Sequence, residues 1–384
     1  MRSKLSIPGI FFVTVVLLFT SSSAIPKPAG ATAMAAWPFS PRLVPGMPGV
    51  PNPVSVAVAA SASDAQCREY SFPVTTGQAG GAAAKIWGQL CTDDPARLGE
   101  QPVQVLIHGG AYDHTYFDWP YQPDRYNYVR SMTRQGFTVL NFDRLGYGHS
   151  DHPLGASLTF DVAAFTVHQL IQHLRRGSLG RPFPTIVTNG FSMGGLIAQV
   201  EAATFHDVDA LTTHAVGHYF GAPRSLVRLA TVAYPALLDP KFSSRPWALD
   251  PTYLTTLPGR RVVFYGPPGT YDPAQLEYEE KDKDVVTATE LADIVAKSYT
   301  ELTQRIDAPI LWTLGEYDQI WCGTTDNCFT DPETAGEASH YKAGLFTKYI
   351  APDDGHSVIL GLGTTAYQAE VVSWLRARGI RGVR

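Results

Sequence analysis

Gly190-Phe191-Ser192-Met193-Gly194 is the stretch of sequence that decides the fold. Residues 184–189 before it are rich in β-branched side chains and predict a buried strand, whereas residues 196–203 after it are mostly small or strong helix formers. A sharp turn between a strand and a helix is the context in which a G-x-S-x-G motif carries chemistry. We therefore expect a strained backbone at Ser192 and no room for side chains at the two flanking glycines.

The chain is long enough to bury a large core, since it has 384 residues, of which 45% are hydrophobic. One large α/β domain with an insertion fits this length better than several small domains. The net charge is -5, since acidic residues outnumber basic ones, so we expect no nucleic-acid partner.

The N-terminus has the pattern of a secretory signal peptide. Arg2 and Lys4 precede an apolar segment at 10–19, and Ser22-Ser23-Ala24 is a small-residue cleavage site. We expect residues 1–24 to be removed, the protein to be secreted and no stable membrane anchor to remain; an uncleaved anchor is the alternative. Residues 25–66 are rich in Pro, Ala, Gly and Ser, which predicts a disordered tail.

Four cysteines follow, and an even number in an exported chain indicates disulfides. Three pairings are possible, and proximity in the sequence favours Cys67–Cys91 together with Cys322–Cys328. A metal site is the rival interpretation, but no histidine or second cysteine lies at ligand spacing from any of them. We therefore expect two disulfides and no metal.

Strands and helices alternate along residues 67–384, the predicted folded domain. This alternation predicts an α/β fold with a mostly parallel central sheet and helices on both faces. The predicted strands are 67–74, 82–90, 103–107, 137–142, 184–189, 208–214, 309–314 and 346–350, and the predicted helices are 126–135, 159–176, 196–203 and 365–378.

The alternation stops in residues 219–284, which are rich in proline and aromatic residues. Together with a following helix they predict a cap inserted at about residues 219–306. That helix begins at a capping box, Thr287-x-x-Glu290. Its apolar stripe consists of Leu291, Ile294, Val295, Leu302 and Ile306.

Five short motifs each follow a predicted strand, where open α/β sheets place their sites. They are His108-Gly109-Gly110, Asp143…Gly146-x-Gly148-x-Ser150, the stretch around Ser192, Gly315-Glu316-Tyr317-Asp318 and Gly355-His356. By these motifs the chain resembles the α/β-hydrolase superfamily from about Cys67 to its C-terminus, and the order Ser, Asp, His is also that of the superfamily.

The resemblance implies a catalytic triad of Ser192 as nucleophile, His356 as base and Asp318 as acid. A serine hydroxyl needs a base to take its proton as it attacks, and a histidine does this near pH 7. The aspartate holds the imidazole in the right tautomer and stabilises its charged form. Glu316 and Asp326 are rival acids, and a loop histidine without a catalytic role is the alternative for His356.

The resemblance also assigns the backbone N–H groups of Gly110 and Met193 to an oxyanion hole. The alternative is that Gly109 and Gly110 serve only the geometry of the turn. We expect His108 to have a structural role and no catalytic one. Only two glycines follow His108, so the likeness to the HGGG-type lipases and esterases is partial. A serine at 192, in place of an aspartate nucleophile, argues against epoxide hydrolase and haloalkane dehalogenase activity.

Aromatic residues crowd two regions of the sequence and predict an aromatic-walled pocket for an apolar or aromatic substrate group. They are Tyr112, Tyr116, Phe117, Trp119 and Tyr121 after the oxyanion motif and Tyr219, Phe220, Trp247, Tyr253, Phe264 and Tyr265 in the predicted cap. The alternative is that many of them fill the core of the cap.

These observations predict a secreted serine hydrolase that cleaves small carboxylic esters through an acyl-enzyme on Ser192, without a cofactor. A lactonase, a cofactor-free perhydrolase or haloperoxidase, and a peptidase use the same triad and stay as alternatives. A non-catalytic protein that binds a hydrophobic ligand is the alternative of another class, against which the intact triad argues.

Overall fold

The computed structural model describes residues 51–58, 61–62, 64–77, 81–219, 228–229, 231–296, 299–322 and 325–383. The predicted signal peptide (1–24), residues 25–50 of the predicted tail and Phe220 of the predicted pocket lie outside these residues. No helix in the described ranges is long and apolar enough to span a bilayer.

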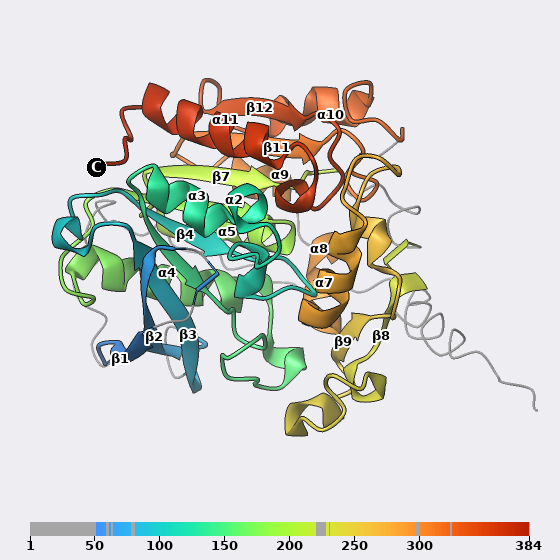
Figure 1. Cartoon of the computed structure of the whole chain (residues 1–384), viewed down its shortest axis with the longest axis horizontal. Helices are drawn as coiled ribbons and strands as arrows, with labels where there is room; N and C mark the ends of the chain where they lie inside the picture. The colour runs from blue at the N-terminus through green and yellow to red at the C-terminus, as the bar shows by residue number, and fades with distance from the viewer. Residues whose placement is uncertain are drawn as a thin grey trace, which may run out of the picture.

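Nine strands form one large sheet across the described residues (Figure 1). They are β1 (Val54–Val58), β2 (Gln66–Thr75), β3 (Ala83–Thr92), β4 (Val103–Ile107), β5 (Thr138–Phe142), β6 (Ile186–Phe191), β7 (Ala210–His214), β11 (Ile310–Gly315) and β12 (Phe346–Ala351). Their order is β1-β2-β3-β5-β4-β6-β7-β11-β12. The pairs from β1 to β5 are antiparallel, and those from β5 to β12 are parallel.

Helices cover both faces of the parallel part of this sheet. Every residue of β4, β5, β6, β7 and β11 is buried, as expected for parallel strands between two helical layers. The described helices are α2 (Pro123–Tyr126), α3 (Tyr128–Arg134), α4 (Phe160–Arg176), α5 (Met193–Phe205), α7 (Ala274–Asp282), α8 (Ala288–Ala296), α9 (Tyr299–Thr303), α10 (Pro332–Gly336) and α11 (Thr364–Ala377). α11 packs against α2 and α3, whereas α4 packs against α5. The predicted fold class is confirmed.

The ends of α4 agree with the sequence, but the helix predicted at 126–135 does not. Thr159 caps α4 by accepting a hydrogen bond from the N–H of Val162 (3.2 Å), and Gly177 ends it with a φ of 74°. The segment 126–135 is instead divided between α2 and α3. Asn127 has an extended backbone between them and caps α3, since its Oδ1 accepts from the N–H of Arg130 (2.7 Å).

The predicted disordered tail contains a strand, so the prediction for residues 25–66 is wrong at its C-terminal end. β1 pairs antiparallel with β2 at the edge of the large sheet. Alternating valines in the sequence Val54-Ser55-Val56-Ala57-Val58 favour an extended backbone, and the free edge of β2 supplies the hydrogen-bond partners.

The chain between β7 and β11 is here called the insertion, and most of its described residues form a separate layer at one end of the large sheet (yellow and orange in Figure 1). This layer contains a three-stranded antiparallel sheet of order β10-β9-β8, together with α7 and α8, whereas α9 packs against α5 on the large sheet. The strands are β8 (Ala233–Pro235), β9 (Tyr253–Thr256) and β10 (Val285–Thr287). The strand–helix alternation of the parallel sheet does stop here, as expected, and the individual elements were not predicted because strands this short leave little periodic pattern in the sequence.

The predicted capping box begins α8 as expected. Thr287 Oγ1 accepts from the N–H of Glu290, and Glu290 Oε2 accepts from the N–H of Thr287, both at 3.2 Å. The apolar stripe predicted for one helix is divided between α8, α9 and the turn after α9, which contains Ile306. Within it Ile294 is buried, whereas Val295 is 53% exposed.

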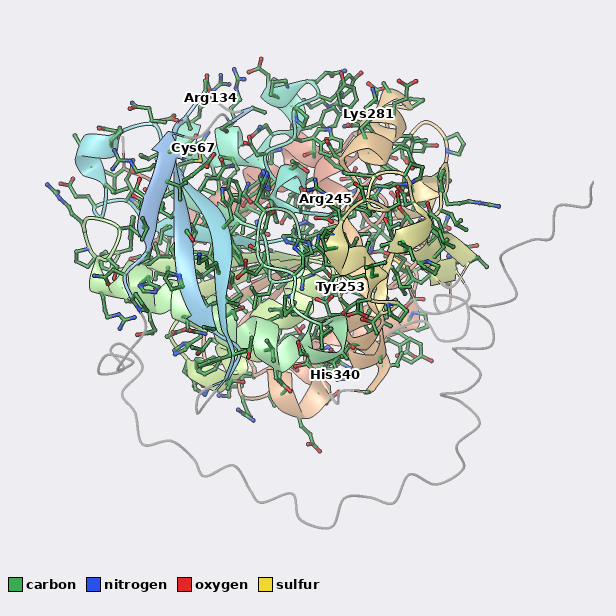
Figure 2. The ribbon with its side chains drawn as sticks, turned by 90° about the horizontal axis from the view of Figure 1, so that it is seen from below. Cys67, Arg134, Arg245, Tyr253, Lys281 and His340 are labelled. Atoms are coloured by element: carbon green, nitrogen blue, oxygen red, sulfur yellow. A yellow bond between two sulfur atoms is a disulfide. The ribbon has the colours of Figure 1, made fainter. Side chains whose placement is uncertain are left out.

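The predicted disulfide pairing is confirmed, with bonds Cys67–Cys91 and Cys322–Cys328. Cys67 and Cys91 are directly opposite each other on β2 and β3, near one end of the blue strands in Figure 2. The second bond closes a short loop after β11.

We expect the double variant Cys67→Ala with Cys91→Ala to lower the melting temperature. The bond spans a sequence separation of 24, for which the chain-entropy treatment gives about 3 kcal/mol. Cys322→Ala with Cys328→Ala is the matched control, because its separation of 6 gives only about 2 kcal/mol. Thermal unfolding of both variants tests this expectation, and a larger loss for the control would contradict it.

Candidate active site

Ser192 lies in a sharp turn between β6 and α5. Its φ of 52° and ψ of -119° are the strained conformation that the motif predicts. A Cβ atom at Gly190 would lie 2.5 Å from the carbonyl oxygen of Gly194, and one at Gly194 would overlap the carbonyl of Ile107 on β4. Glycine is therefore required at both positions, which brings β6, α5 and β4 close together.

A continuous series of hydrogen bonds joins the three residues of the predicted triad. The ring atom Nε2 of His356 lies 2.9 Å from Ser192 Oγ, and Nδ1 lies 3.0 Å from Asp318 Oδ2. His356 is 2% exposed and Asp318 is fully buried. Nδ1–H donates to the carboxylate, so Nε2 is left to accept from the serine hydroxyl.

The loop after β11 holds the carboxylate of Asp318 in place. Asp318 Oδ1 accepts from the N–H groups of Ile320 (2.9 Å) and Trp321 (3.1 Å). The rival acids have other partners. Glu316 accepts from the side-chain amide of Asn327 (2.7 Å), and the side chain of Asp326 is 69% exposed.

A cavity of about 50 Å³ adjoins Ser192 and His356. Much of its wall is aliphatic and comes from the insertion, including Val232, Val286, Leu291 and Ile294. The predicted aromatic wall is therefore wrong in its main feature. Of the predicted aromatic residues that the structure describes, only Tyr112 and Phe264 line the cavity, and Trp321, which also lines it, was not predicted. The core takes up most of the others, among them Tyr116, Phe117, Trp119, Tyr253 and Tyr265.

Two residues with unused main-chain N–H groups line this cavity. Gly110 and Met193 both line the cavity with Ser192, and within the described residues neither N–H donates a hydrogen bond. The next N–H along the chain, that of Ala111, donates to the carbonyl of Val285 on β10 (2.8 Å). Ala111 has a φ of 61°, so the turn after β4 is also strained.

A buried arginine holds the first part of this turn. Arg144 donates from Nε to the carbonyl of His108 (3.1 Å) and from Nη2 to that of Gly109 (3.3 Å). Its Nη1 pairs with Glu290 of α8, which also accepts from the hydroxyl of Tyr147 (2.6 Å). Sequence reasoning identified Glu290 only as a helix cap, and nothing local indicates its second partner.

A second buried arginine, Arg261 of the insertion, holds the other end of the turn. It donates to the carbonyl of Ala111 (3.1 Å) and pairs with Glu279 of α7 (2.8 Å). Glu279 in turn accepts from the hydroxyl of Tyr112 (2.7 Å), which also lies 2.8 Å from Ser357 Oγ, next to His356. This pair was also missed, because its members and their partners are far apart in sequence.

The predicted structural role of His108 agrees with its surroundings. His108 is fully buried, and burial lowers its pKa to about 3. Its Nε2 accepts from the N–H of Arg144 (3.0 Å), and its Nδ1–H donates to the carbonyl of Gly109 (2.9 Å). A neutral imidazole thus joins the turn after β4 to the loop after β5.

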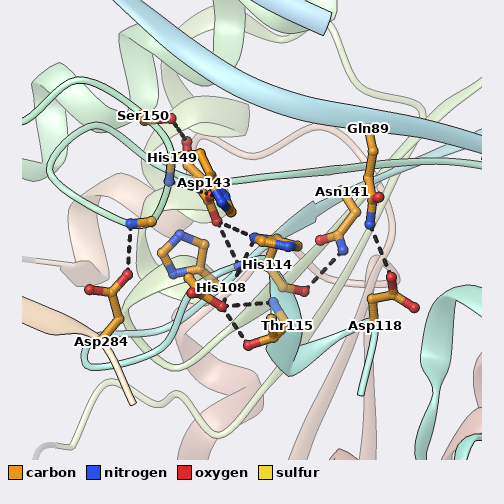
Figure 3. Close-up of polar contacts among 12 residues, drawn as sticks. Gln89, His108, His114, Thr115, Asp118, Asn141, Asp143, His149, Ser150 and Asp284 are labelled. Carbon is orange, nitrogen blue, oxygen red and sulfur yellow. Dashed lines mark hydrogen bonds and ion pairs between the residues drawn. The ribbon is translucent and has the colours of Figure 1, made fainter. Parts of the chain in front are cut away.

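Asp143 organises the loop after β5 (Figure 3). Its carboxylate accepts from the main-chain N–H groups of His114 and His149, both at 2.8 Å. Burial alone would lower the pKa of His114, but the charge of Asp143 outweighs it and raises this pKa to about 9. On the opposite side Asp284 accepts from the N–H of Gly148 (2.7 Å), and burial and neighbouring carboxylates raise its pKa to about 8.

Three groups of histidine and carboxylate side chains within the described ranges have ligand atoms close enough for a metal ion. They are His114–Asp143–His149, His218–Glu337–His340 and His168–Glu201–Asp207. None of the three includes Ser192, His356 or Asp318. The expected independence of a cofactor stays a prediction.

The fold is similar to that of solved hydrolases and a peroxidase. A thermophilic esterase from Thermogutta terrifontis has 18% identity and a TM-score of 0.53, over 80% of this chain and 98% of that one. A bromoperoxidase from Bacillus anthracis has 16% identity and a TM-score of 0.51, over 80% and 99% of the two chains. At these identities the likeness concerns the fold alone.

The sequence comparisons agree with the fold. No curated protein matches the chain. A family model described as "Alpha/beta hydrolase family" matches residues 104–371, well over half of the sequence. The chain therefore belongs to the alpha/beta hydrolase family.

Proposed function

We propose that the protein is a serine hydrolase that cleaves carboxylic esters through an acyl-enzyme on Ser192. The hydrogen-bonded series from Ser192 through His356 to Asp318 is the observation that supports this most strongly. The family is one of hydrolases, and the adjoining cavity supplies an apolar space next to the serine hydroxyl.

In the proposed reaction, Ser192 Oγ attacks the ester carbonyl carbon while His356 Nε2 takes the hydroxyl proton. Asp318 stabilises the imidazolium through Nδ1–H. His356 then gives the proton to the alkoxy oxygen as its bond to the acyl carbon breaks. Water attacks the acyl-enzyme in the same way, which releases the carboxylic acid and restores Ser192.

The negative charge that develops on the carbonyl oxygen needs donors already in place. We assign this role to the N–H groups of Gly110 and Met193, which have no other acceptor within the described residues. Arg144 and Arg261 fix the carbonyls of the same turn, so the orientation of its peptide groups is set before substrate arrives.

The proposed substrate has a short, apolar acyl group, and we propose that the enzyme acts outside the cell. A cavity of about 50 Å³ is small beside the roughly 300–1,000 Å³ of typical ligand pockets. A long acyl chain would thus require the wall from the insertion to move. The two disulfides support an oxidising compartment.

Ser192→Ala and His356→Ala should each lower kcat for p-nitrophenyl acetate by on the order of 10⁴ or more, and the double variant should be little worse, because the residues act as a unit. Labelling by a fluorophosphonate should vanish in Ser192→Ala. His340→Ala, a histidine outside this series, is the control and should keep its activity. Near wild-type turnover in His356→Ala would remove that residue from the mechanism.

Turnover of lactones or aminoacyl amides without turnover of open-chain esters would contradict the proposed substrate class.

Asp318→Asn should preserve the fold and lower kcat by on the order of 10⁴, since an amide favours the wrong imidazole tautomer. Asp326→Asn is the matched control, because its exposed carboxylate lies 3.9 Å from Arg228. Circular dichroism checks the fold, and steady-state kinetics measure the loss. Greater damage from the control would mean that the acid has been misassigned.

Ile294→Ala should move the preference toward longer acyl chains, because it removes a buried part of the cavity wall. We expect the ratio of kcat/KM for an octanoate ester to that for an acetate ester to rise by roughly 10-fold or more. The adjacent variant Val295→Ala changes an exposed side chain of the same helix and should leave the ratio unchanged. Equal profiles for both variants would show that the acyl group binds elsewhere.

A further inference from the structure

A group of ligand-type side chains lies away from Ser192, between α4 and the far end of α5. His168 belongs to α4, Glu201 to α5 and Asp207 to the loop that leads into β7. All three are buried, with exposed fractions of 3%, 0% and 3%. Glu201 is nine residues beyond Ser192, or about 13 Å along the helix, so this group is separate from the proposed active site.

The carboxylates of this group are poorly supplied with hydrogen-bond donors. Asp207 Oδ2 accepts from His168 Nδ1 and Gln172 Nε2, both at 2.7 Å. Asp207 Oδ1 and both carboxylate oxygens of Glu201 are buried and have no donor among the described residues while both acids are ionised. Burial and the neighbouring Asp207 raise the pKa of Glu201, which favours a proton shared between the two acids when no cation is bound. Burying such oxygens without a partner is costly. The group therefore has three oxygens that a bound cation would satisfy.

A neighbouring arginine does not supply this positive charge directly. Arg175 donates to the main-chain carbonyl of Asp207 (2.8 Å) and to the carboxylate of Asp209 (2.6 Å). Its guanidinium is thus engaged with another acid. Gln172 presents Nε2 to Asp207, and its Oε1 is buried without a donor among the described residues, so the amide would offer an oxygen ligand only after turning over.

We propose that His168, Glu201 and Asp207 bind one divalent cation and that the ion is Zn²⁺. His168 Nδ1 lies 2.7 Å from Asp207 Oδ2 and 3.9 Å from Glu201 Oε1, and the three ligand atoms lie within 4.8 Å of one another. Tetrahedral zinc separates its ligand atoms by about 3.4 Å, so the pair at 2.7 Å must open and the pair at 3.9 Å must close when the ion binds. His168 Nδ1 must also give up the proton that it donates to Asp207, because a ligating imidazole nitrogen is deprotonated. Two carboxylates and a neutral imidazole balance the charge of the ion, and the imidazole favours zinc over magnesium or calcium.

In the other two groups of metal-ligand residue types, the carboxylate oxygens already have hydrogen-bond donors. In His218–Glu337–His340, Glu337 Oε1 accepts from His218 Nδ1 (2.7 Å) and Oε2 from the His218 N–H (3.2 Å). Asp143 likewise has donors on both of its oxygens. Each of these carboxylates already has hydrogen-bond partners, so neither requires an ion.

The proposed site is structural. It would join α4, α5 and the loop before β7, and so stabilise the helix that begins at Ser192. The rival account is a protonated Glu201 that donates to Asp207. Glu201→Gln separates the two, because a glutamine side chain keeps a donor for Asp207 but is a poor zinc ligand.

The test measures zinc bound per chain by mass spectrometry after dialysis of the full chain against zinc and then against buffer. Wild type should retain one zinc more than Glu201→Gln, and the control Glu337→Gln should equal wild type. Prolonged EDTA treatment should lower the melting temperature of wild type and of the control by at least about 3 °C, and that of Glu201→Gln not at all. Equal zinc in wild type and Glu201→Gln, or no EDTA effect on wild type, would overturn the proposal.

A second measurement covers the case in which Glu201→Gln does not fold. Wild-type crystals grown with zinc should show an anomalous difference peak at the zinc edge between His168, Glu201 and Asp207. Absence of a peak at this position would also overturn the proposal.

Discussion

The position of the Ser192 hydroxyl depends on one contact between backbones. Gly194 at the start of α5 lies so close to the carbonyl of Ile107 on β4 that no Cβ fits between them. The same closeness at Gly190 holds Ser192 at a positive φ. Such a conformation costs about 1–3 kcal/mol, which the burial of α5 against the sheet offsets. The hydroxyl is therefore fixed by three elements of the core.

Two buried ion pairs that involve the insertion fix the orientation of the peptide groups in the turn after β4. Glu290 and Glu279 hold Arg144 and Arg261, and these arginines hold three carbonyls of the turn after β4. Desolvation makes a buried ion pair a weak source of net stability, although breaking one by removing a single partner costs about 3–5 kcal/mol. We infer that the two pairs serve mainly to fix the direction of the peptide groups in this turn.

The sequence was sufficient to predict the mostly parallel sheet, the pairing of both disulfides and the proximity of Ser192, His356 and Asp318. Parallel strands end at one edge, so motifs that follow successive strands are brought together without knowledge of any side-chain contact. The cavity wall could not be predicted in this way. Arg261 and Ala111 are 150 residues apart, and which side chains of the insertion face Ser192 depends on strands of three or four residues. β1 was missed because its valines follow a Pro- and Ala-rich segment.

The size of the cavity and the orientation of the turn after β4 are coupled through the same elements. The carbonyl of Val285 on β10 accepts from the N–H of Ala111, whereas the N–H of the preceding Gly110 has no acceptor within the described residues. The next residue of β10, Val286, lines the cavity and lies 3.1 Å from where a Cβ of Gly110 would be. Moving the insertion outward to admit a larger substrate would therefore also release the turn. A change of substrate length is thus easier to achieve by trimming Leu291 or Ile294 of α8, whose apolar side chains line the cavity and cannot hydrogen-bond to the turn, than by displacing the insertion.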